Sequence, residues 1–180
     1  MRIIAGKFGG RSILAPTSLP VRPTTDYAKS GLFNILNNHF DFENLKVLDL
    51  FCGTGNISFE FASRGTNDIT CVDKHPGCVK FVSEFAGKIG ALGIKTVKAD
   101  VTKFIRQHEA QYDIIFADPP FELMDTDELT NLILQKQMLK ENGWLIVEHM
   151  NKRKLKTDFE PAEVREYGNC AFSIYKNSSL

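Results

Sequence analysis

The sequence has little of what marks secreted and membrane proteins. Its four cysteines, Cys52, Cys71, Cys78 and Cys170, include no C-x-x-C pair, and its first residues lack the long apolar core of a secretory leader. We therefore expect reduced thiols and a cytoplasmic location rather than a disulfide framework. No uninterrupted apolar run approaches the length that spans a bilayer, so we expect no membrane association.

Metal ligands and net charge are also scarce. The histidines, His39, His75, His108 and His149, are scattered without the spacing of a metal site, so no metal is expected. The 22 basic residues balance the 22 acidic ones, so no overall field attracts a polyanion, and any surface for nucleic acid must be local. A chain of 180 residues suits one domain, which can bury roughly 70% of the surface of its unfolded form without help from a metal or disulfide.

Basic residues do gather in the first part of the chain. Residues 1–25 contain Arg2, Lys7, Arg11 and Arg22 and no acid, inside a neutral protein. This asymmetry indicates contact with a polyanion, and an ordinary solvated hairpin explains it equally well. The glycines within residues 6–10 predict a small hairpin that turns there. We therefore divide the chain into a basic hairpin extension, residues 1–23, and a main domain, residues 24–180.

The main domain is organised around the stretch from residue 47 to residue 56. Its apolar run predicts a buried parallel strand, and Gly53 and Gly55 let the backbone turn tightly and approach a ligand at the start of a helix. Asp49 would repel the pyrophosphate of a dinucleotide, whereas S-adenosylmethionine brings a cationic amine and a sulfonium to that place. Asp49 therefore favours S-adenosylmethionine. The other interpretation is a structural turn with a capping aspartate.

Strand and helix patterns alternate along the chain. Pro23 precedes residues that favour a helix start, and Leu32, Ile35, Leu36 and Phe40 fall on one helical face. Later patterns predict helices over residues 56–64, 76–90, 101–108 and 125–139, and strands over residues 69–73, 94–99, 112–117, 143–148, 162–167 and 171–175. This order predicts an α/β fold, a Rossmann-like three-layer sandwich with a mostly parallel twisted sheet and an antiparallel C-terminal hairpin.

Acidic residues accompany the first three predicted strands. A parallel sheet would bring Asp49, Asp73 and Asp100 to the edge where open α/β folds bind ligands. Asp73 lies twenty positions after Gly53, the distance at which a β-α-β unit returns a carboxylate to a ribose with two hydroxyl groups. A dinucleotide site predicts the same residue, and each acid could instead cap a helix. With an adenosine-type ligand, Asp100 is expected to reach the adenine amino group.

The strand over residues 112–117 runs directly into Asp118, Pro119, Pro120 and Phe121. Consecutive prolines remove two donors and fix the direction of the backbone, so the carbonyl groups there are rigid, free acceptors. Together with the Asp118 carboxylate and the Phe121 ring, they suit a planar group that carries an NH2. The alternative is a loop stiffened by proline.

These residues resemble known motifs. Residues 49–55 resemble the cofactor loop of class I methyltransferases, and residues 118–121 resemble the D/N-P-P-Y/F/W signature of enzymes that methylate planar amino groups. Almost the whole chain resembles the RsmD family, bacterial enzymes that methylate the N2 of a guanine in 16S ribosomal RNA. The likeness includes residues 2–7, 22–26, 32–34 and 167–168, and residues 2–7 and 22–26 are its more specific part. The resemblance implies the class I methyltransferase fold over residues 24–180, S-adenosylmethionine as the cofactor, and 16S rRNA or an assembling small ribosomal subunit as the partner of a monomer.

With the resemblance, the predicted sites are three sets of residues. Catalysis is assigned to Asp118, Pro119, Pro120 and Phe121. Cofactor binding is assigned to Asp49, Phe51, Cys52, Gly53, Thr54, Gly55, Asn56, Asp73, Lys74, Asp100 and Val101. RNA contact is assigned to Arg2, Lys7, Arg11, Arg22, Thr24 and Lys29. The sequence departs from the family pattern at Tyr27, where a basic residue is common, at Ser30, where glutamate is common, and at Ser58, where the cofactor turn often has a third glycine.

Three other functions stay open. A DNA adenine-N6 methyltransferase, or an enzyme acting on another planar amine, shares the motif at residues 118–121. A nicotinamide dehydrogenase would keep the glycine turn and Asp73, but it leaves Asp49 and the two prolines unexplained. A non-catalytic RNA-binding module would use the basic extension alone.

Overall fold

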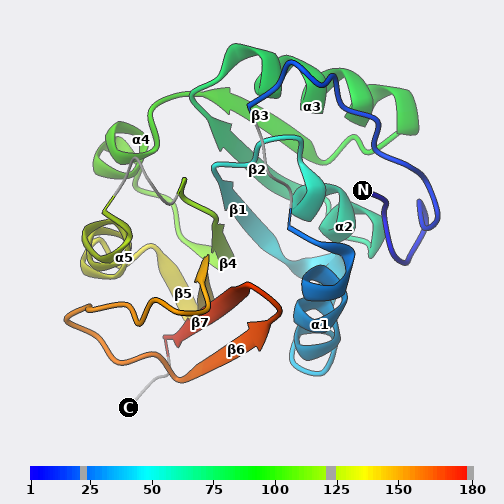
Figure 1. The fold of residues 1–180 in the computed structure, drawn as a ribbon. Coiled ribbons are helices and arrows are strands. Elements are labelled where there is room, and N and C mark those ends of the chain that lie inside the picture. The colour runs from blue at the N-terminus through cyan, green and yellow to red at the C-terminus, as the bar shows by residue number, and fades with distance from the viewer. Residues whose placement is uncertain (21–23, 121–124, 178–180) are drawn as a thin grey trace.

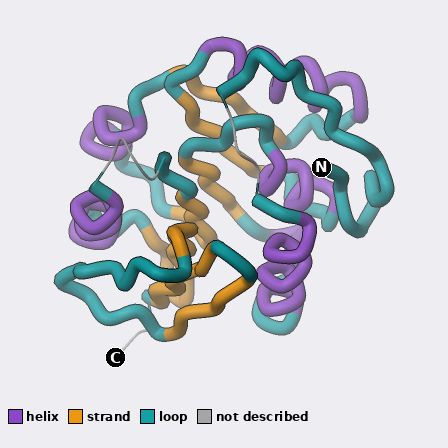
Figure 2. Tube along the Cα trace, in the orientation of Figure 1, coloured by secondary structure: helices purple, strands orange, loops and turns teal. Residues whose placement is uncertain are grey.

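The computed structural model describes residues 1–20, 24–120 and 125–177 of the chain. Within them, the strands form a seven-stranded sheet in the order β3-β2-β1-β4-β5-β7-β6 (Figures 1 and 2). The strands are β1 Lys46–Leu50, β2 Asp68–Asp73, β3 Ile94–Lys98, β4 Tyr112–Ala117, β5 Leu139–Met150, β6 Glu163–Tyr167 and β7 Cys170–Lys176. β1 to β5 are parallel, whereas β7 is antiparallel to β5 and to β6. The predicted parallel sheet with an antiparallel C-terminal hairpin is confirmed.

Helices cover both faces of this sheet (Figure 2). They are α1 Asp26–Asn37, α2 Asn56–Ser63, α3 Pro76–Ile89, α4 Val101–Gln107 and α5 Thr126–Gln135, with a short 3-10 helix, η1, over Phe42–Asn44. Apolar side chains of α1, α2 and α3 share one buried cluster, and those of α4 and α5 share a second. Because side chains alternate along a strand, β1 sends Val47 into the first cluster and Leu48 into the second. The three-layer sandwich is therefore also confirmed.

The boundary between α5 and β5 differs from the prediction. The helix was expected to reach residue 139, but it ends at Gln135, and Gln137 adopts a left-handed backbone conformation with φ +52°. The carbonyl of Met138 instead accepts the N–H of Tyr112, which begins the pairing of β5 with β4. β5 is therefore longer than predicted, and its register shifts between Tyr112 and Ile114.

The first residues form a short, irregular hairpin that turns within residues 5–10, as predicted. We call residues 1–20 the basic arm. Its two sides join through one antiparallel bridge, between Arg2 and Ser12, and through backbone hydrogen bonds such as that from the Ile3 N–H to the Arg11 carbonyl. Ile3, Phe8 and Ile13 are buried in the first apolar cluster, so the arm packs on the main body of the protein. Figure 1 shows the N-terminus beside α2.

Candidate functional site

Three of the predicted site residues lie at the carboxyl edge of the parallel strands. β1 pairs with β2 on one side and with β4 on the other, so the strand order reverses between β1 and β4. Open α/β sheets bind ligands in the crevice at such a switch point. Asp73 ends β2, Asp100 follows β3 and Asp118 follows β4, which brings all three to this edge.

The turn after β1 has an unusual backbone. Phe51, Gly53 and Gly55 all have positive φ, at 61°, 52° and 75°. Positive φ is rare for a bulky residue, so Phe51 marks a strained position of the kind that clusters at functional sites. A Cβ at Gly55 would lie 2.8 Å from Phe59 Cε2 and 3.1 Å from Val82 Cγ2. The turn therefore needs glycine at residue 55 both for its conformation and for the close packing of α2.

Asp73 joins this turn to the start of α3. Its Oδ2 accepts the N–H of Gly53 at 2.9 Å, and its Oδ1 accepts the N–H of His75 at 2.8 Å. A carboxylate oxygen has two acceptor positions, so each oxygen can still accept from a ribose hydroxyl. His75 Nδ1 is also buried, and no polar atom of the described residues hydrogen-bonds to it. The free acceptor positions of Asp73 and this ring nitrogen of His75, beside the turn, fit the ribose and base of an adenosine-type cofactor.

Asp49 does not lie on the rim where the sequence placed it. Its side chain is 2% exposed and points to α2, where Ser58 Oγ donates to Asp49 Oδ2 at 2.5 Å. Burial raises the pKa of Asp49 to about 7, against the opposing effect of the Ser58 hydrogen bonds. The electrostatic argument from Asp49 is therefore corrected: the carboxylate shapes the turn from inside. Ser58, where a glycine is common in the family, is its hydrogen-bond partner.

Lys29, predicted to contact RNA, is buried instead. Its side chain is fully buried, and its Nζ donates to the Arg2 carbonyl at 2.6 Å and to Asn56 Oδ1 at 2.7 Å. Lys29 Nζ also lies 3.6 Å from Glu60 Oε2, and burial lowers the pKa of Lys29 while Glu60 opposes this effect. The assignment of Lys29 to an RNA surface is therefore wrong, because no part of this ammonium group faces solvent.

Asn56 and Thr24 belong to the same buried network. Asn56 Nδ2 donates to the Thr24 carbonyl at 2.9 Å, and the Thr24 hydroxyl donates to Glu148 Oε2 at 2.6 Å. Asn56 was predicted to bind the cofactor and Thr24 to contact RNA, but both side chains act inside the protein. Glu60 and Glu148 were missed by the sequence analysis. The signal for Glu148 was available, since it is a further acid at the end of an apolar strand pattern.

The Asp118 corner, residues 118–120, lies on the other side of this edge, directly after β4. Asp118 N–H donates to the Leu50 carbonyl at 3.4 Å, Pro119 is buried and Pro120 is exposed. The thiol of Cys170 has a pKa raised to about 12, first by burial and then by the nearby carboxylates of Glu148 and Asp118. Glu148 and Asp118 thus place two carboxylates on this side of the edge, near Cys170. Phe121 lies outside the described residues, so its predicted stacking role stays a prediction.

The remaining cofactor residues contribute in different ways. Cys52 and Thr54 are buried, with Thr54 Oγ1 3.4 Å from Met1 Sδ, so they line the turn mainly through their backbone. Val101 is buried in the second apolar cluster at the start of α4, whereas Lys74 is exposed. Asp100 is exposed, and its Oδ1 accepts the N–H of Lys103 at 3.0 Å as the cap of α4. One oxygen of Asp100 is thereby used by the helix.

The exposed cations of the basic arm are available for a ligand. Arg11 and Lys7 are exposed and lie over the Phe8 ring, at 5.7 and 5.4 Å from its centroid. Arg2 is 65% exposed in its side chain and pairs with Asp26 at 3.1 Å. Arg22 lies outside the described residues, so its role stays a prediction.

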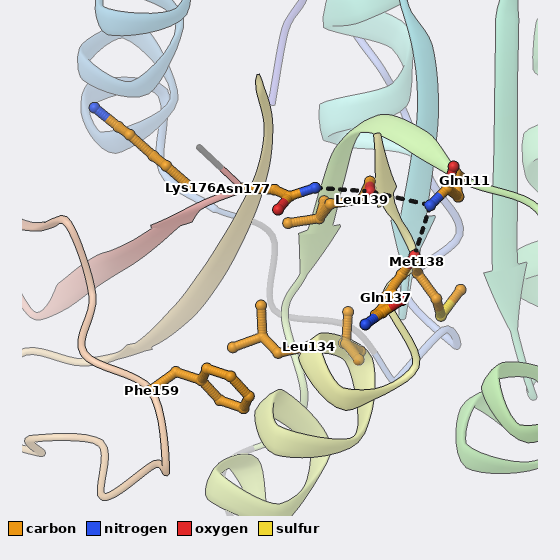
Figure 3. A pocket seen from close by; sticks show the side chains of 9 residues that line it. Gln111, Leu134, Gln137, Met138, Leu139, Phe159, Lys176 and Asn177 are labelled. Carbon is orange, nitrogen blue, oxygen red and sulfur yellow. Dashed lines mark hydrogen bonds between the residues drawn. The ribbon is translucent and has the colours of Figure 1, made fainter. Parts of the chain in front are cut away.

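A hollow of about 360 Å³ lies at the opposite edge of the sheet (Figure 3). Gln111, Leu134, Met138 and Phe159 help to line it, near the start of β4. Of the described residues that line it, none belongs to the predicted sites, so we do not connect it with the reaction.

No helix in the described part of the chain is long and apolar enough to cross a membrane. Residues 1–20, 24–120 and 125–177 also contain no group of three His, Cys, Asp or Glu side chains that could hold a metal ion.

Comparison with known proteins identifies the family. The family model described as Conserved hypothetical protein 95 matches residues 1–176. Ribosomal RNA small subunit methyltransferase D of Escherichia coli (strain K12) is 30% identical over 145 residues, which cover 81% of this chain and 69% of that protein. Putative rRNA methyltransferase YlbH of Bacillus subtilis (strain 168) is 29% identical over 98% of both chains. The solved structure of putative methyltransferase yhhF from Escherichia coli has a TM-score of 0.86 at 25% identity, over 100% of this chain and 99% of that one. The chain therefore belongs to the RsmD family of methyltransferases.

Proposed function

We propose that this protein transfers a methyl group from S-adenosylmethionine to the N2 amine of a guanine in 16S ribosomal RNA. The observation that carries the proposal is the position of the Asp118–Pro120 corner. It follows β4 directly beside the turn after β1, across the switch point from Asp73. A cofactor held at Asp73 and an amine held at Asp118 would therefore face each other at one edge of the sheet.

Protein groups on the β1–β3 side hold the cofactor. S-adenosylmethionine supplies a methyl group that its sulfonium charge has already activated. Asp73 accepts from the ribose hydroxyls through the acceptor positions that Gly53 and His75 leave free. Asp100 has a second carboxylate oxygen for the adenine amino group. Asp49 keeps α2 in place through Ser58, and so preserves the shape of the turn that would hold the methionyl part of the cofactor.

Protein groups on the β4 side orient the acceptor. The lone pair of a guanine N2 is delocalised into the ring, so the amine is a weak nucleophile. Its two N–H groups donate to the Asp118 carboxylate and to the carbonyl of Pro119 or Pro120, which turns the lone pair toward the methyl group. Alignment of donor and acceptor can contribute about 7–11 kcal/mol. Asp118 acts chiefly as an acceptor, because the amine becomes acidic only after it is methylated, and the methylated nitrogen then loses its extra proton to water.

The basic arm is the contact surface for the RNA backbone in this proposal. Arg2, Lys7 and Arg11 are exposed there, and none of them is needed to hold the apolar cluster together. We propose residues 1–23 as the RNA-contacting extension and residues 24–180 as the methyltransferase domain. The substrate is then 16S rRNA or an assembling small subunit, and the protein acts as a monomer in the cytoplasm.

Mass spectrometry of nucleosides tests the proposal. RNA and DNA from a strain that lacks this protein are compared with those from the parent strain. We expect the loss of one N2-methylguanosine from 16S rRNA, restored by the wild-type protein but not by Asp118→Ala. Loss of N6-methyladenine from DNA would instead support the DNA methyltransferase. Unchanged nucleosides, with RNA binding by the purified protein, would support the non-catalytic module.

A further inference from the structure

We propose that Tyr27 and Tyr167 form a stacking platform for an unpaired RNA base beside the methylated nucleotide. We call these two residues the aromatic platform. The inference rests on the proposed function, because it takes an RNA strand at the Asp118 edge as its starting point. The platform adds a contact between an aromatic ring and an RNA base to the contacts that the charged residues of the basic arm make with the RNA backbone.

The sheet register brings the platform to the acceptor side of the site. Ala117 of β4 pairs with Val147, so Asp118 is level with Glu148 of β5. Further along the same edge, Met150 pairs with Cys170 of β7, and Cys170 pairs with Tyr167 of β6. Neighbouring strands lie about 4.8 Å apart, so the backbone of β6 is about 14 Å from that of β4. This separation suits a neighbouring nucleotide rather than the extruded base itself.

The start of α1 lies at the same edge. The Thr24 hydroxyl donates to Glu148 Oε2 at 2.6 Å, and α1 begins two residues later. Tyr27, in the first turn of α1, is 70% exposed. Its ring lies 5.6 Å from that of Tyr167 at an interplanar angle of 78°, an edge-to-face contact. Figure 1 shows α1 beside β6, the two elements that carry Tyr27 and Tyr167.

Tyr167 is the fixed half of the platform. Its ring lies 5.7 Å from that of Phe172, which is fully buried. A Cβ at Gly31 would lie 2.1 Å from Tyr167 Cε1, so the absence of a side chain at residue 31 is what makes room for the ring. Tyr27 therefore rests against a firmly packed neighbour while most of its surface faces solvent. Such a ring loses little freedom when a base stacks on it.

Charges beside the platform suit a nucleic acid strand. Arg2 pairs with Asp26, the residue before Tyr27, and Arg165 lies two residues before Tyr167 on the same face of β6. The Arg2 and Arg165 side chains are 65% and 54% exposed. Exposed ion pairs contribute little, so a phosphate can replace Asp26 beside Arg2 at low cost, while Arg165 keeps its pair with Glu163, at 2.7 Å. Cations next to a flat exposed ring are the combination by which proteins hold unpaired bases.

Binding of fluorescein-labelled oligouridylate, and of a 16S rRNA fragment, measured by fluorescence anisotropy, tests the platform. Stacking on an aromatic ring contributes about 1–3 kcal/mol, so Tyr27→Ala should raise the Kd about 5- to 150-fold. Tyr27→Phe should bind like the wild type because it keeps the ring. Tyr27→Leu, which is apolar but not planar, should bind like Tyr27→Ala. The log–log salt slope should stay the same in all three, because no phosphate contact is lost.

The matched control is Leu92→Ala, which removes another apolar side chain, 88% exposed, from the loop between α3 and β3. This variant should bind RNA like the wild type. Equal Kd values for wild type and Tyr27→Ala, wild-type binding by Tyr27→Leu, or no RNA binding by the wild type would each overturn the platform. In methyl transfer to rRNA, Tyr27→Ala should raise the KM for RNA and leave kcat unchanged. Failure of the proposed function is a separate result, since a wild type that forms no methylated guanosine can still be compared with its variants in binding.

Discussion

Lys29→Met tests whether the buried lysine stabilises the fold or contacts RNA. Methionine is unbranched and similar in length, so the variant removes the charge without a large change in packing. The Lys29 ammonium hydrogen-bonds to the Arg2 carbonyl and Asn56 Oδ1 and pairs with Glu60. The variant leaves these three groups buried without this partner.

The loss of stability depends on the partners that Glu60 retains in the variant. Removal of one partner from a buried ion pair costs about 3–5 kcal/mol when the other charge is left uncompensated. Glu60 retains Arg64, whose Nη2 lies 2.9 Å from Oε1, and the N–H groups of Ile4 and Ala5. This puts the ion-pair loss near the lower end, and the two orphaned acceptors add to it. We expect the free energy of unfolding to fall by about 3–5 kcal/mol, a large share of the roughly 5–15 kcal/mol of a whole protein.

Urea unfolding followed by circular dichroism measures this loss. With an m-value of about 1–3 kcal/mol/M, the midpoint should fall by roughly 1–5 M. The matched control is Lys80→Met, which breaks an exposed pair between Lys80 and Glu84 and should change stability by less than about 0.5 kcal/mol. In a double-mutant cycle, adding Glu60→Gln to Lys29→Met should cost less than Glu60→Gln alone costs in the wild type. An unchanged midpoint together with a smaller salt slope for RNA binding would refute the reasoning and return Lys29 to the RNA surface.

Three further predictions concern the site. Asp118→Ala should abolish methyl transfer while S-adenosylmethionine binding, measured by calorimetry, stays within a few fold; an equal loss of both would contradict the acceptor role. Arg11→Ala should flatten the salt dependence of RNA binding by roughly 0.7–0.9 in log–log slope, and an unchanged slope would make the arm an ordinary solvated loop. The pKa of Asp49 is about 7 in the folded protein, above its ordinary value of 3.8, so its contribution to stability is fully present below about pH 4 and is lost as the pH rises through about 7. In urea unfolding, Asp49→Asn should therefore gain stability relative to the wild type as the pH rises from about 4 to about 7. A difference in unfolding free energy that does not change with pH would contradict the effect of burial on Asp49.

The central parallel strands β1, β4 and β5 were predictable because each contains a short apolar run that is buried on both faces. β4 was predicted with both ends correct, since Tyr112 and Ala117 are flanked by residues that break a buried pattern. The prediction for α5 extended too far because it included Met138, which lies five residues after Ile133 and so falls off the helical face that Leu129 and Ile133 share. The helix has already ended where Gln137 adopts its left-handed conformation.

The site was predicted in position but not in the orientation of its side chains. Lys29 precedes Leu32, Phe33 and Leu36 by three, four and seven residues, so helical spacing alone would have placed it on the buried face of α1. Its partner Glu60 lies on another helix and could not be predicted from local patterns. Asp49 was assigned to the rim because it precedes the glycine turn, but strand alternation directs it toward α2.

The arm is attached to the protein through its main chain as well as through the buried side chains of Ile3, Phe8 and Ile13. The amides of Ile4 and Ala5 donate to Glu60, and those of Lys7 and Phe8 donate to Ser63 at the end of α2. Any non-proline residue supplies the same amide, so the outward side chains can be exchanged while the path of the arm is preserved. Substrate preference in such a protein can thus diverge, or be engineered, by surface replacements alone, with the anchoring pair on α2 held constant.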